Sequence, residues 1–508
     1  KIFYIQRGNI LSRNLLKSNV VEKLLRKKSP DELISESKKS GLKKTLNAFD
    51  LIVLGVGAII GTGIFSLSGI AINGDIHAGP SFMLSIIIAS FVCLFSALSY
   101  AEFAAMIPVA GSGYTYTYSV MGEFAAWIMG WLLILEYAIG NITVAKSWSY
   151  YWFNLLQGFD FLPDIIKNPK YWMFEFHLFG DVHLDIHIPA LLLLTAITYL
   201  LYKGVEESAK TAALMVFLKI AVIALFVIVG AFYVKPEHWV PFAPGGMKGI
   251  LQGTFIILLA YVGFDAVSTA AEETKNPKRD IPIGIVGSLF ICSLVYVAVA
   301  AVLTGIMPWN IVDPGAPIAE ALRYVNQGWI AGFIAAGALA GLTSVLLVLQ
   351  LGVSRILLSM ARDNLLPPIL GSIHERHKTP HIVTIAVGAF VAFGTLFLSV
   401  KSAAQIANIG TLIAFSMVSL GVIILRKTDP NRPRSFKVPF VPYVPALGIL
   451  CSLYIIYKGV EGNMPVVISF FVWMLIGIVV YFSYGFKQNT ITEKEEKSNV
   501  VELAKVRE

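Results

Sequence analysis

Residues 49–70 read Phe-Asp-Leu-Ile-Val-Leu-Gly-Val-Gly-Ala-Ile-Ile-Gly-Thr-Gly-Ile-Phe-Ser-Leu-Ser-Gly-Ile. The stretch is apolar and long enough to cross a bilayer, which takes about 20 helical residues. Its middle carries Gly61-Thr62-Gly63, and each glycine weakens a helix by about 1 kcal/mol relative to alanine. Freed backbone groups are tolerated inside a membrane where they line a cavity or are buried in protein. We therefore expect a broken span that aims backbone amides into a transporter site, although the spacing of Gly57 and Gly61 also fits simple helix packing.

The composition of the whole chain is that of a membrane protein. Of its 508 residues, 56% are hydrophobic and 14% are charged, with a mean hydropathy of +0.71. Soluble domains average about 25% charged residues. Cys93, Cys292 and Cys451 fall inside apolar segments, so we expect packing residues rather than a disulfide framework. The twelve segments long enough to span are 49–72, 81–106, 124–148, 188–203, 208–234, 248–271, 282–306, 329–356, 382–398, 404–425, 442–458 and 464–485.

Basic residues are distributed unevenly between the two ends of these segments. With the N-terminus inside, 31 of the 40 Lys and Arg residues fall in cytoplasmic tails and loops, and 8 fall outside. An excess of basic residues in short loops marks the cytoplasmic side. We therefore expect both termini in the cytoplasm and no cleavable signal peptide in the first 47 residues. The net charge of +8 then reflects this cytoplasmic excess and attraction to anionic lipid, and it does not indicate binding to nucleic acid.

A second interrupted segment covers residues 248–271, where Gly263 and Asp265 stand in an otherwise apolar run. The interrupted segments are the first and the sixth, and interruptions at corresponding places indicate an inverted repeat with its site at the midplane. We therefore predict an all-α polytopic protein of twelve transmembrane helices, with helices 1 and 6 broken. The expected domains are a cytoplasmic tail (1–47), a first inverted repeat (48–234), a second inverted repeat (235–426), two added helices (427–487) and a cytoplasmic tail (488–508).

Three motifs stand out in the chain: Gly57-Ala-Ile-Ile-Gly-Thr-Gly-Ile-Phe65, Pro108-Val-Ala-Gly-Ser-Gly-Tyr-Thr-Tyr116 and Gly263-Phe-Asp-Ala-Val-Ser-Thr-Ala-Ala-Glu-Glu-Thr-Lys-Asn-Pro277. Together they resemble the amino acid–polyamine–organocation (APC) superfamily, with the bacterial cationic amino acid transporters as the most similar branch. The resemblance runs from about 43 to 487 and implies the leucine-transporter-type arrangement of five plus five inverted helices. It also implies amino acid transport by alternating access, which many bacterial members drive with protons. Leu132 stands where some close relatives have Asp, which speaks against a strongly cation-selecting pocket.

The two interruptions are the expected binding site for the substrate. The amides of Gly61, Thr62 and Gly63 suit a carboxylate, because a half-helix N-terminus presents free N–H groups and a favourable dipole. By resemblance, Leu349 would line the pocket for the substrate side chain. A packing kink without a ligand is the alternative at both interruptions. By resemblance, the substrate ammonium would be accepted by the unwound carbonyls of Ile60, Leu259, Ala260 and Val262.

Charged residues inside the apolar segments are the expected coupling site. Lys219 and Glu136 lie near the centres of the fifth and third segments, where a charge costs about 2.5–3.5 kcal/mol on insertion scales, so a functional role is the default. By resemblance, Lys219 places its amine where sodium-coupled relatives hold an ion, and would couple proton to substrate movement; a static ion pair is the alternative. Glu136 would receive a proton, brace the first helix or attract a basic group. Asp265 joins this coupling group or caps the resumed half-helix, and Glu102 is expected at the membrane interface.

These features predict a secondary active L-amino acid transporter of the plasma membrane that works by proton-coupled symport. An amino acid or polyamine exchanger without proton coupling and a transporter-like sensor or subunit that needs a partner chain are the alternatives. No catalytic residue, metal or cofactor is expected, and His183-x-Asp185-x-His187 is interpreted as a solvated loop rather than a zinc site. The expected partners are the amino acid, protons and membrane lipids, without nucleic acid. A sterol or a small membrane peptide between the helices is left open.

Overall fold

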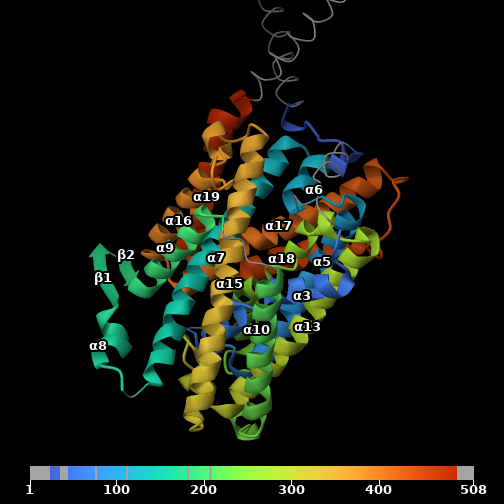
Figure 1. The fold of residues 1–508 in the computed structure, drawn as a ribbon. Coiled ribbons are helices and arrows are strands. Elements are labelled where there is room, and N and C mark those ends of the chain that lie inside the picture. Colours follow the sequence, from blue (N-terminus) through green and yellow to red (C-terminus); the bar gives the residue numbers. More distant parts are fainter. Residues whose placement is uncertain are drawn as a thin grey trace, which may run out of the picture.

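The computed structural model describes residues 23–31, 33–34, 44–74, 77–109, 112–159, 161–179, 182–204 and 209–488. This part of the chain is helical almost throughout, and α10 and α15 run side by side over much of its height (Figure 1). Most of the tails expected at 1–47 and 488–508 lies outside the described residues. The architecture is that of a polytopic membrane protein.

Four groups of elements make up the fold. The long unbroken helices are α5 (Phe82–Met106), α7 (Glu123–Gln157), α10 (Ala209–Ala231), α13 (Pro277–Ile306), α15 (Gly328–Arg362) and α17 (Val400–Thr428). Shorter apolar helices are α9 (Ile188–Tyr202), α16 (His381–Thr395), α18 (Tyr443–Gly459) and α19 (Met464–Val480). The interrupted segments comprise α3 (Ala48–Ile59) with α4 (Ser68–Asn73), and α11 (Gly246–Ile257) with α12 (Ala266–Thr269). Connecting elements are α6 (Ser112–Val120), α8 (Asp164–Lys167), α14 (Pro317–Tyr324), β1 (Met173–Phe179) and β2 (Val182–His187).

The spans expected from the sequence are matched in part. In the described residues, eight helices are long and apolar enough to cross a membrane. A ninth is reached if Ala48–Ile59 and Gly63–Asn73, which are bent by 41° at their break, form one span. The helices α9, α16 and α18 are apolar but shorter. The first and sixth segments are interrupted as predicted.

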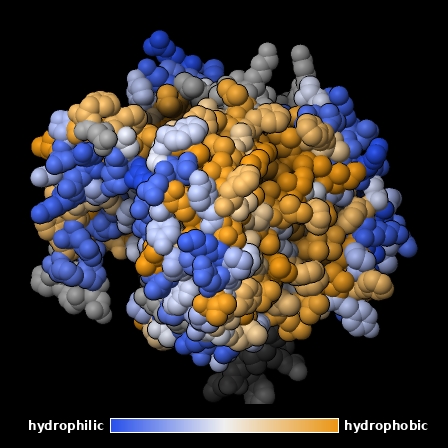
Figure 2. All heavy atoms as spheres, turned by 90° about the horizontal axis from the view of Figure 1, so that it is seen from below, coloured by the Kyte–Doolittle hydropathy of each residue, from blue (hydrophilic) through white to orange (hydrophobic). Residues whose placement is uncertain are grey.

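Large apolar side chains cover the outside of the helices. Phe217 on α10 and Phe471 on α19, for example, are 58% and 65% exposed. Figure 2 shows hydrophobic residues gathered over a broad part of the surface, with hydrophilic residues at its margins. Such a surface is stable in lipid, since the hydrocarbon replaces the protein core as the apolar environment.

Glu102 lies near the end of α5, as expected for a residue close to the end of the second span, and it is buried in the protein. Its side chain is 1% exposed and forms a two-pronged pair with Arg426 of α17, at 2.9 and 2.8 Å. Arg434 lies 3.2 Å from the same carboxylate. The paired arginines compensate the cost of burying the carboxylate.

A β-hairpin precedes α9 and was not predicted from the sequence. Strands β1 and β2 are antiparallel, with Met173 opposite His187, and project from the side of the bundle beside α8 (Figure 1). His187 is 2% exposed and lies 3.0 Å from Asp185. Asp185 also accepts a 2.6 Å hydrogen bond from Lys146 of α7. The interpretation as a solvated loop is therefore wrong for this end of the hairpin.

Candidate substrate and coupling site

The first interruption separates α3 from the half-helix that follows it. The hydrogen bonding of α3 ends with the Ile60 amide, which donates to Val56 over 2.9 Å, and Ile60 itself is extended (φ −72°, ψ 101°). A π-helical turn begins at Gly63 and leads into α4. The first amides of a helix have no partner within it. Gly61, Thr62 and Gly63 therefore stand at the start of the second half-helix, where such amides occur, and all three are buried.

The second interruption follows α11. A 3-10 turn over Leu258–Tyr261 ends in an extended Val262, and Gly263 then adopts φ +120°, a backbone conformation that side chains with a Cβ rarely take. The chain becomes helical again at α12. The glycine in this span thus permits the break itself.

The two interruptions pack directly on each other. A Cβ on Gly63 would overlap Ala260, and a Cβ on Gly263 would lie 2.8 Å from the carbonyl carbon of Ala58. Each glycine therefore lets the opposite segment approach its backbone. The structure brings together all seven expected residues of the two interruptions, and all are buried; they are Ile60, Gly61, Thr62, Gly63, Leu259, Ala260 and Val262.

Tyr296 of α13 joins the two interruptions and was missed in the sequence. Its hydroxyl donates to the carbonyl oxygen of Ile59 over 2.8 Å and lies 3.2 Å from that of Ala260. Tyr151 of α7 similarly donates to the carbonyl oxygen of Phe65 over 2.6 Å. These hydroxyls satisfy carbonyl groups that a continuous helix would satisfy itself. A tyrosine in an apolar run gives no sign of such a partner, because the partner comes from another helix.

Lys219 lies between the first interrupted segment and α15. Its side-chain nitrogen donates to the carbonyl oxygen of Gly57 over 2.9 Å, and the side chain is 1% exposed. Its methylene chain packs on Gly341, where a Cβ would lie 3.0 Å from Lys219 Cγ. The amine thus lies between the first and the eighth expected spans, the position that the resemblance implies.

Glu136 and Asp265 are both buried, at 1% exposure each, but their surroundings differ. Asp265 accepts hydrogen bonds from the Tyr137 hydroxyl over 2.7 Å and from the Gly263 amide over 3.2 Å. Its side chain does not cap α12, so the capping interpretation is wrong. Neither carboxylate oxygen of Glu136 has a hydrogen-bond partner among the described residues. An ionised carboxylate without donors is costly to bury, so Glu136 is suited to hold a proton or meet a cationic group.

Leu349 is half-buried on α15 and faces α7. A Cβ on Gly140 would lie 3.6 Å from Leu349 Cδ1. The next residue, Gln350, points elsewhere and donates to the Thr198 hydroxyl over 2.7 Å. On the same helix, Val345 lies 3.0 Å from a Cβ on Gly61. One side of α15 therefore places Val345 against the first interruption and Leu349 against α7.

Comparison with known proteins places this arrangement in a family. Residues 46–492 match the model of the amino acid permease family. The chain is 43% identical to the branched-chain amino acid permease BcaP of Bacillus subtilis over 474 residues, which is 92% of this chain and 99% of that protein. It is 41% identical to the methylthioribose transporter of the same organism, with the same coverage.

A plant protein is similar as well. Over 418 residues the chain is 36% identical to cationic amino acid transporter 2 of Arabidopsis thaliana, covering 81% of this chain and 64% of that protein. The matches span the interrupted segments and the helices around them. The chain is therefore a transporter rather than an enzyme, and it belongs to the amino acid permease family of the APC superfamily.

Proposed function

We propose that this chain is a secondary active transporter of L-amino acids that works by proton-coupled symport and alternating access. The observation that carries the proposal is the 2.9 Å hydrogen bond from buried Lys219 to the Gly57 carbonyl. A charged donor makes a stronger hydrogen bond than a neutral one. Loss of the proton would weaken the hold of α10 on α3 and free this half of the first span to move.

The substrate backbone would bind between the two interruptions. The amides of Gly61, Thr62 and Gly63 would receive the carboxylate, since the helix dipole there favours negative charge. The ammonium would donate hydrogen bonds to backbone carbonyls of the two interruptions. These are the carbonyls of Ile60 in the first and of Leu259, Ala260 and Val262 in the second. Lys219 would carry one titrating proton and Glu136, which has no hydrogen-bond donor among the described residues, would carry a second. Asp265 would respond to the charge of Glu136 through Tyr137, which follows Glu136 in the chain and donates a hydrogen bond to Asp265.

A neutral aliphatic amino acid is the substrate that we propose. Val345 supplies an apolar side chain beside the first interruption, and Leu349 lies about one turn further along α15, facing Gly140 of α7. The similarity to a branched-chain amino acid permease supports this choice. The similarity to a methylthioribose transporter makes methylthioribose the second candidate.

The finer architecture belongs to the same proposal. The three shorter apolar helices would also cross the bilayer, giving twelve spans with both termini in the cytoplasm of a plasma-membrane protein. The two inverted repeats would cover 48–234 and 235–426, with added helices at 427–487 and tails at 1–47 and 488–508. Membrane lipids would surround the apolar surface. The competing mechanism is exchange of amino acids or polyamines without proton coupling.

Uptake into proteoliposomes tests the function. Purified protein is reconstituted, and labelled leucine, alanine, arginine and methylthioribose are offered under a proton gradient or a sodium gradient. Accumulation of the neutral amino acids under the proton gradient alone is the expected result. Accumulation driven by sodium, or exchange against preloaded substrate without net accumulation, would contradict proton symport. Uptake of methylthioribose in preference to every amino acid would contradict the substrate class.

A further inference from the structure

A groove of about 710 Å³ opens on the side of the bundle between α5, α13 and the loop that follows α17. Its inner part is apolar, and two basic side chains stand at one end. The groove lies outside the proposed substrate site, which is built from the interrupted segments. Its lining includes Leu98, Lys278, Arg279, Pro282, Val286 and Phe436.

One face of α13 forms the floor of this groove. Lys278, Pro282 and Val286 recur every four residues, so they line the same face of the helix. The opposite face packs on α3, where a Cβ on Gly284 would lie 2.7 Å from the Leu51 Cβ. The groove therefore lies directly behind the contact between α13 and the first interrupted segment.

The basic end of the groove favours an anion. Lys278 and Arg279 are exposed in the first turn of α13, a helix of 30 residues, whose N-terminal dipole adds positive potential. Within the described ranges, no ion pair or side-chain hydrogen bond involves either residue. The neighbouring Asp280 is buried at 6% exposure and lies one turn before Gly284, on the face turned to α3. The two cations are thus left to face the groove.

The wall opposite α13 is held in place by α5. Phe436 stands between Arg434, whose Nε lies 3.2 Å from Glu102, and Val438, whose amide donates to Glu102 over 2.7 Å. Both contacts use a carboxylate that is itself buried. The segment that carries Phe436 is therefore fixed on both sides of this residue. The groove is formed in the protein before any ligand binds.

We propose that this groove binds one anionic phospholipid, with its phosphate at Lys278 and Arg279 and an acyl chain along the apolar wall. The exposed apolar surface continues from the groove along both helices, with Phe91 on α5 and Phe290 and Leu294 on α13. Two other occupants fit less well. A small anion would leave the apolar wall uncovered, and a zwitterionic lipid would place the positive charge of its own head group near Lys278 and Arg279. Basic pockets between membrane helices on the cytoplasmic side suit acidic head groups. With both termini in the cytoplasm, as proposed above, this lipid would belong to the inner leaflet; the rest of the proposal does not depend on the orientation.

Native mass spectrometry of the purified full chain tests the site. Phosphatidylglycerol or phosphatidylcholine is titrated in detergent, and bound lipids are counted for wild type and for the double variant Lys278→Gln/Arg279→Gln. A basic residue near an acidic lipid contributes about fivefold in affinity, so the double variant should bind phosphatidylglycerol about thirtyfold more weakly. Binding of phosphatidylcholine should not change. The variant Val286→Trp, which fills the apolar wall and keeps both charges, should also weaken phosphatidylglycerol binding.

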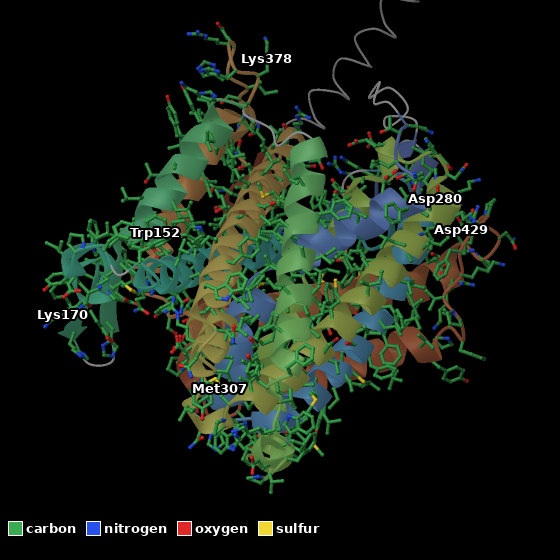
Figure 3. All side chains as sticks on the ribbon, turned by 60° about the horizontal axis from the view of Figure 1, so that its bottom comes forward. Trp152, Lys170, Asp280, Met307, Lys378 and Asp429 are labelled. Carbon is green, nitrogen blue, oxygen red and sulfur yellow. The ribbon has the colours of Figure 1, made fainter. Side chains whose placement is uncertain are left out.

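The matched control removes two charges elsewhere. Arg376 and Lys378 are exposed in the loop before α16, and Figure 3 shows Lys378 well separated from Asp280 at the start of α13. Arg376→Gln/Lys378→Gln should retain the wild-type affinity. Equal losses in both double variants, or equal binding of the two lipids by wild type, would overturn the site. Retained binding in Val286→Trp together with displacement by inorganic phosphate would show a simple anion site and overturn the lipid assignment.

Discussion

The side-chain nitrogen of Lys219 lies 2.9 Å from the carbonyl oxygen of Gly57, joining residues 162 positions apart in the chain. Gly57 precedes the first interruption by three residues, so the bond acts on the half-span whose end lies beside the proposed substrate site. Because the lysine stem also packs on Gly341 of α15, the amine is held in one place. A change of charge on this atom is thereby transmitted to two helices at once.

Replacing Lys219 by Ala should abolish accumulation under an inward proton gradient, because no titrating amine then holds α3. Counterflow of labelled substrate against unlabelled substrate should persist, since the interruptions that bind substrate remain. Lys219→Gln, which keeps a hydrogen-bond donor for Gly57 but cannot titrate, should show the same loss of accumulation. Uptake and counterflow in proteoliposomes measure both properties.

The matched control is Lys248→Ala, which removes an exposed lysine two residues into α11. It should leave accumulation and counterflow unchanged. If Lys219→Ala instead lowers the yield of folded protein while the remaining protein still accumulates substrate, the lysine is structural and the coupling role is wrong.

The interruptions could be predicted because their signals are local. Glycines and a carboxylate inside an apolar run conflict with a continuous membrane helix, and the sequence shows this without any knowledge of the neighbours. The ion pair of Glu102 could not be predicted because its partner Arg426 lies 324 residues away, and the bond from Tyr296 to Ile59 spans 237 residues. Such contacts depend on how helices pack, which no pattern within one segment reveals.

Gly63→Ala should destabilise the protein and reduce uptake. The added Cβ overlaps Ala260, and forcing an extra methyl group into close packing costs about 1–3 kcal/mol. Gly332→Ala is the control, because a Cβ there meets nothing within 4 Å and alanine favours a helix by up to about 1 kcal/mol over glycine. Thermal melting in detergent should therefore fall for Gly63→Ala and stay level or rise for Gly332→Ala. Equal melting temperatures of the two variants would contradict the close packing of the interruptions.

Tyr296→Phe should lower stability by about 1–3 kcal/mol. The change removes the hydroxyl that donates to Ile59 and leaves a buried carbonyl without this partner. Substrate affinity should fall as well, since the same hydroxyl lies beside Ala260 in the second interruption. Melting temperature and half-saturating substrate concentration are the measurements. Tyr443→Phe, at a tyrosine that is 77% exposed, should change neither.

The hairpin should be held to α7 less firmly in acid. Burial opposes ionisation of Asp185, but hydrogen bonds from His187 and Lys146 outweigh it and lower the pKa of this carboxyl to about 2, from an ordinary value of about 3.9. A carboxyl whose pKa is lower in the folded state stabilises it fully above the ordinary pKa. This contribution should therefore be present above about pH 4 and be lost as the pH falls towards the folded-state pKa of about 2.

Hydrogen exchange of residues 173–187, corrected for the intrinsic effect of pH, measures this stability. Asp185→Asn should speed exchange at neutral pH and remove most of the acid dependence, because it leaves the buried Lys146 without a charged partner. Asp164→Asn removes a carboxylate that is 82% exposed and 3.4 Å from Lys167, and should have little effect. Unchanged exchange in Asp185→Asn would mean that strand pairing and the backbone bond from Asp185 to Leu396 hold the hairpin without the ion pair.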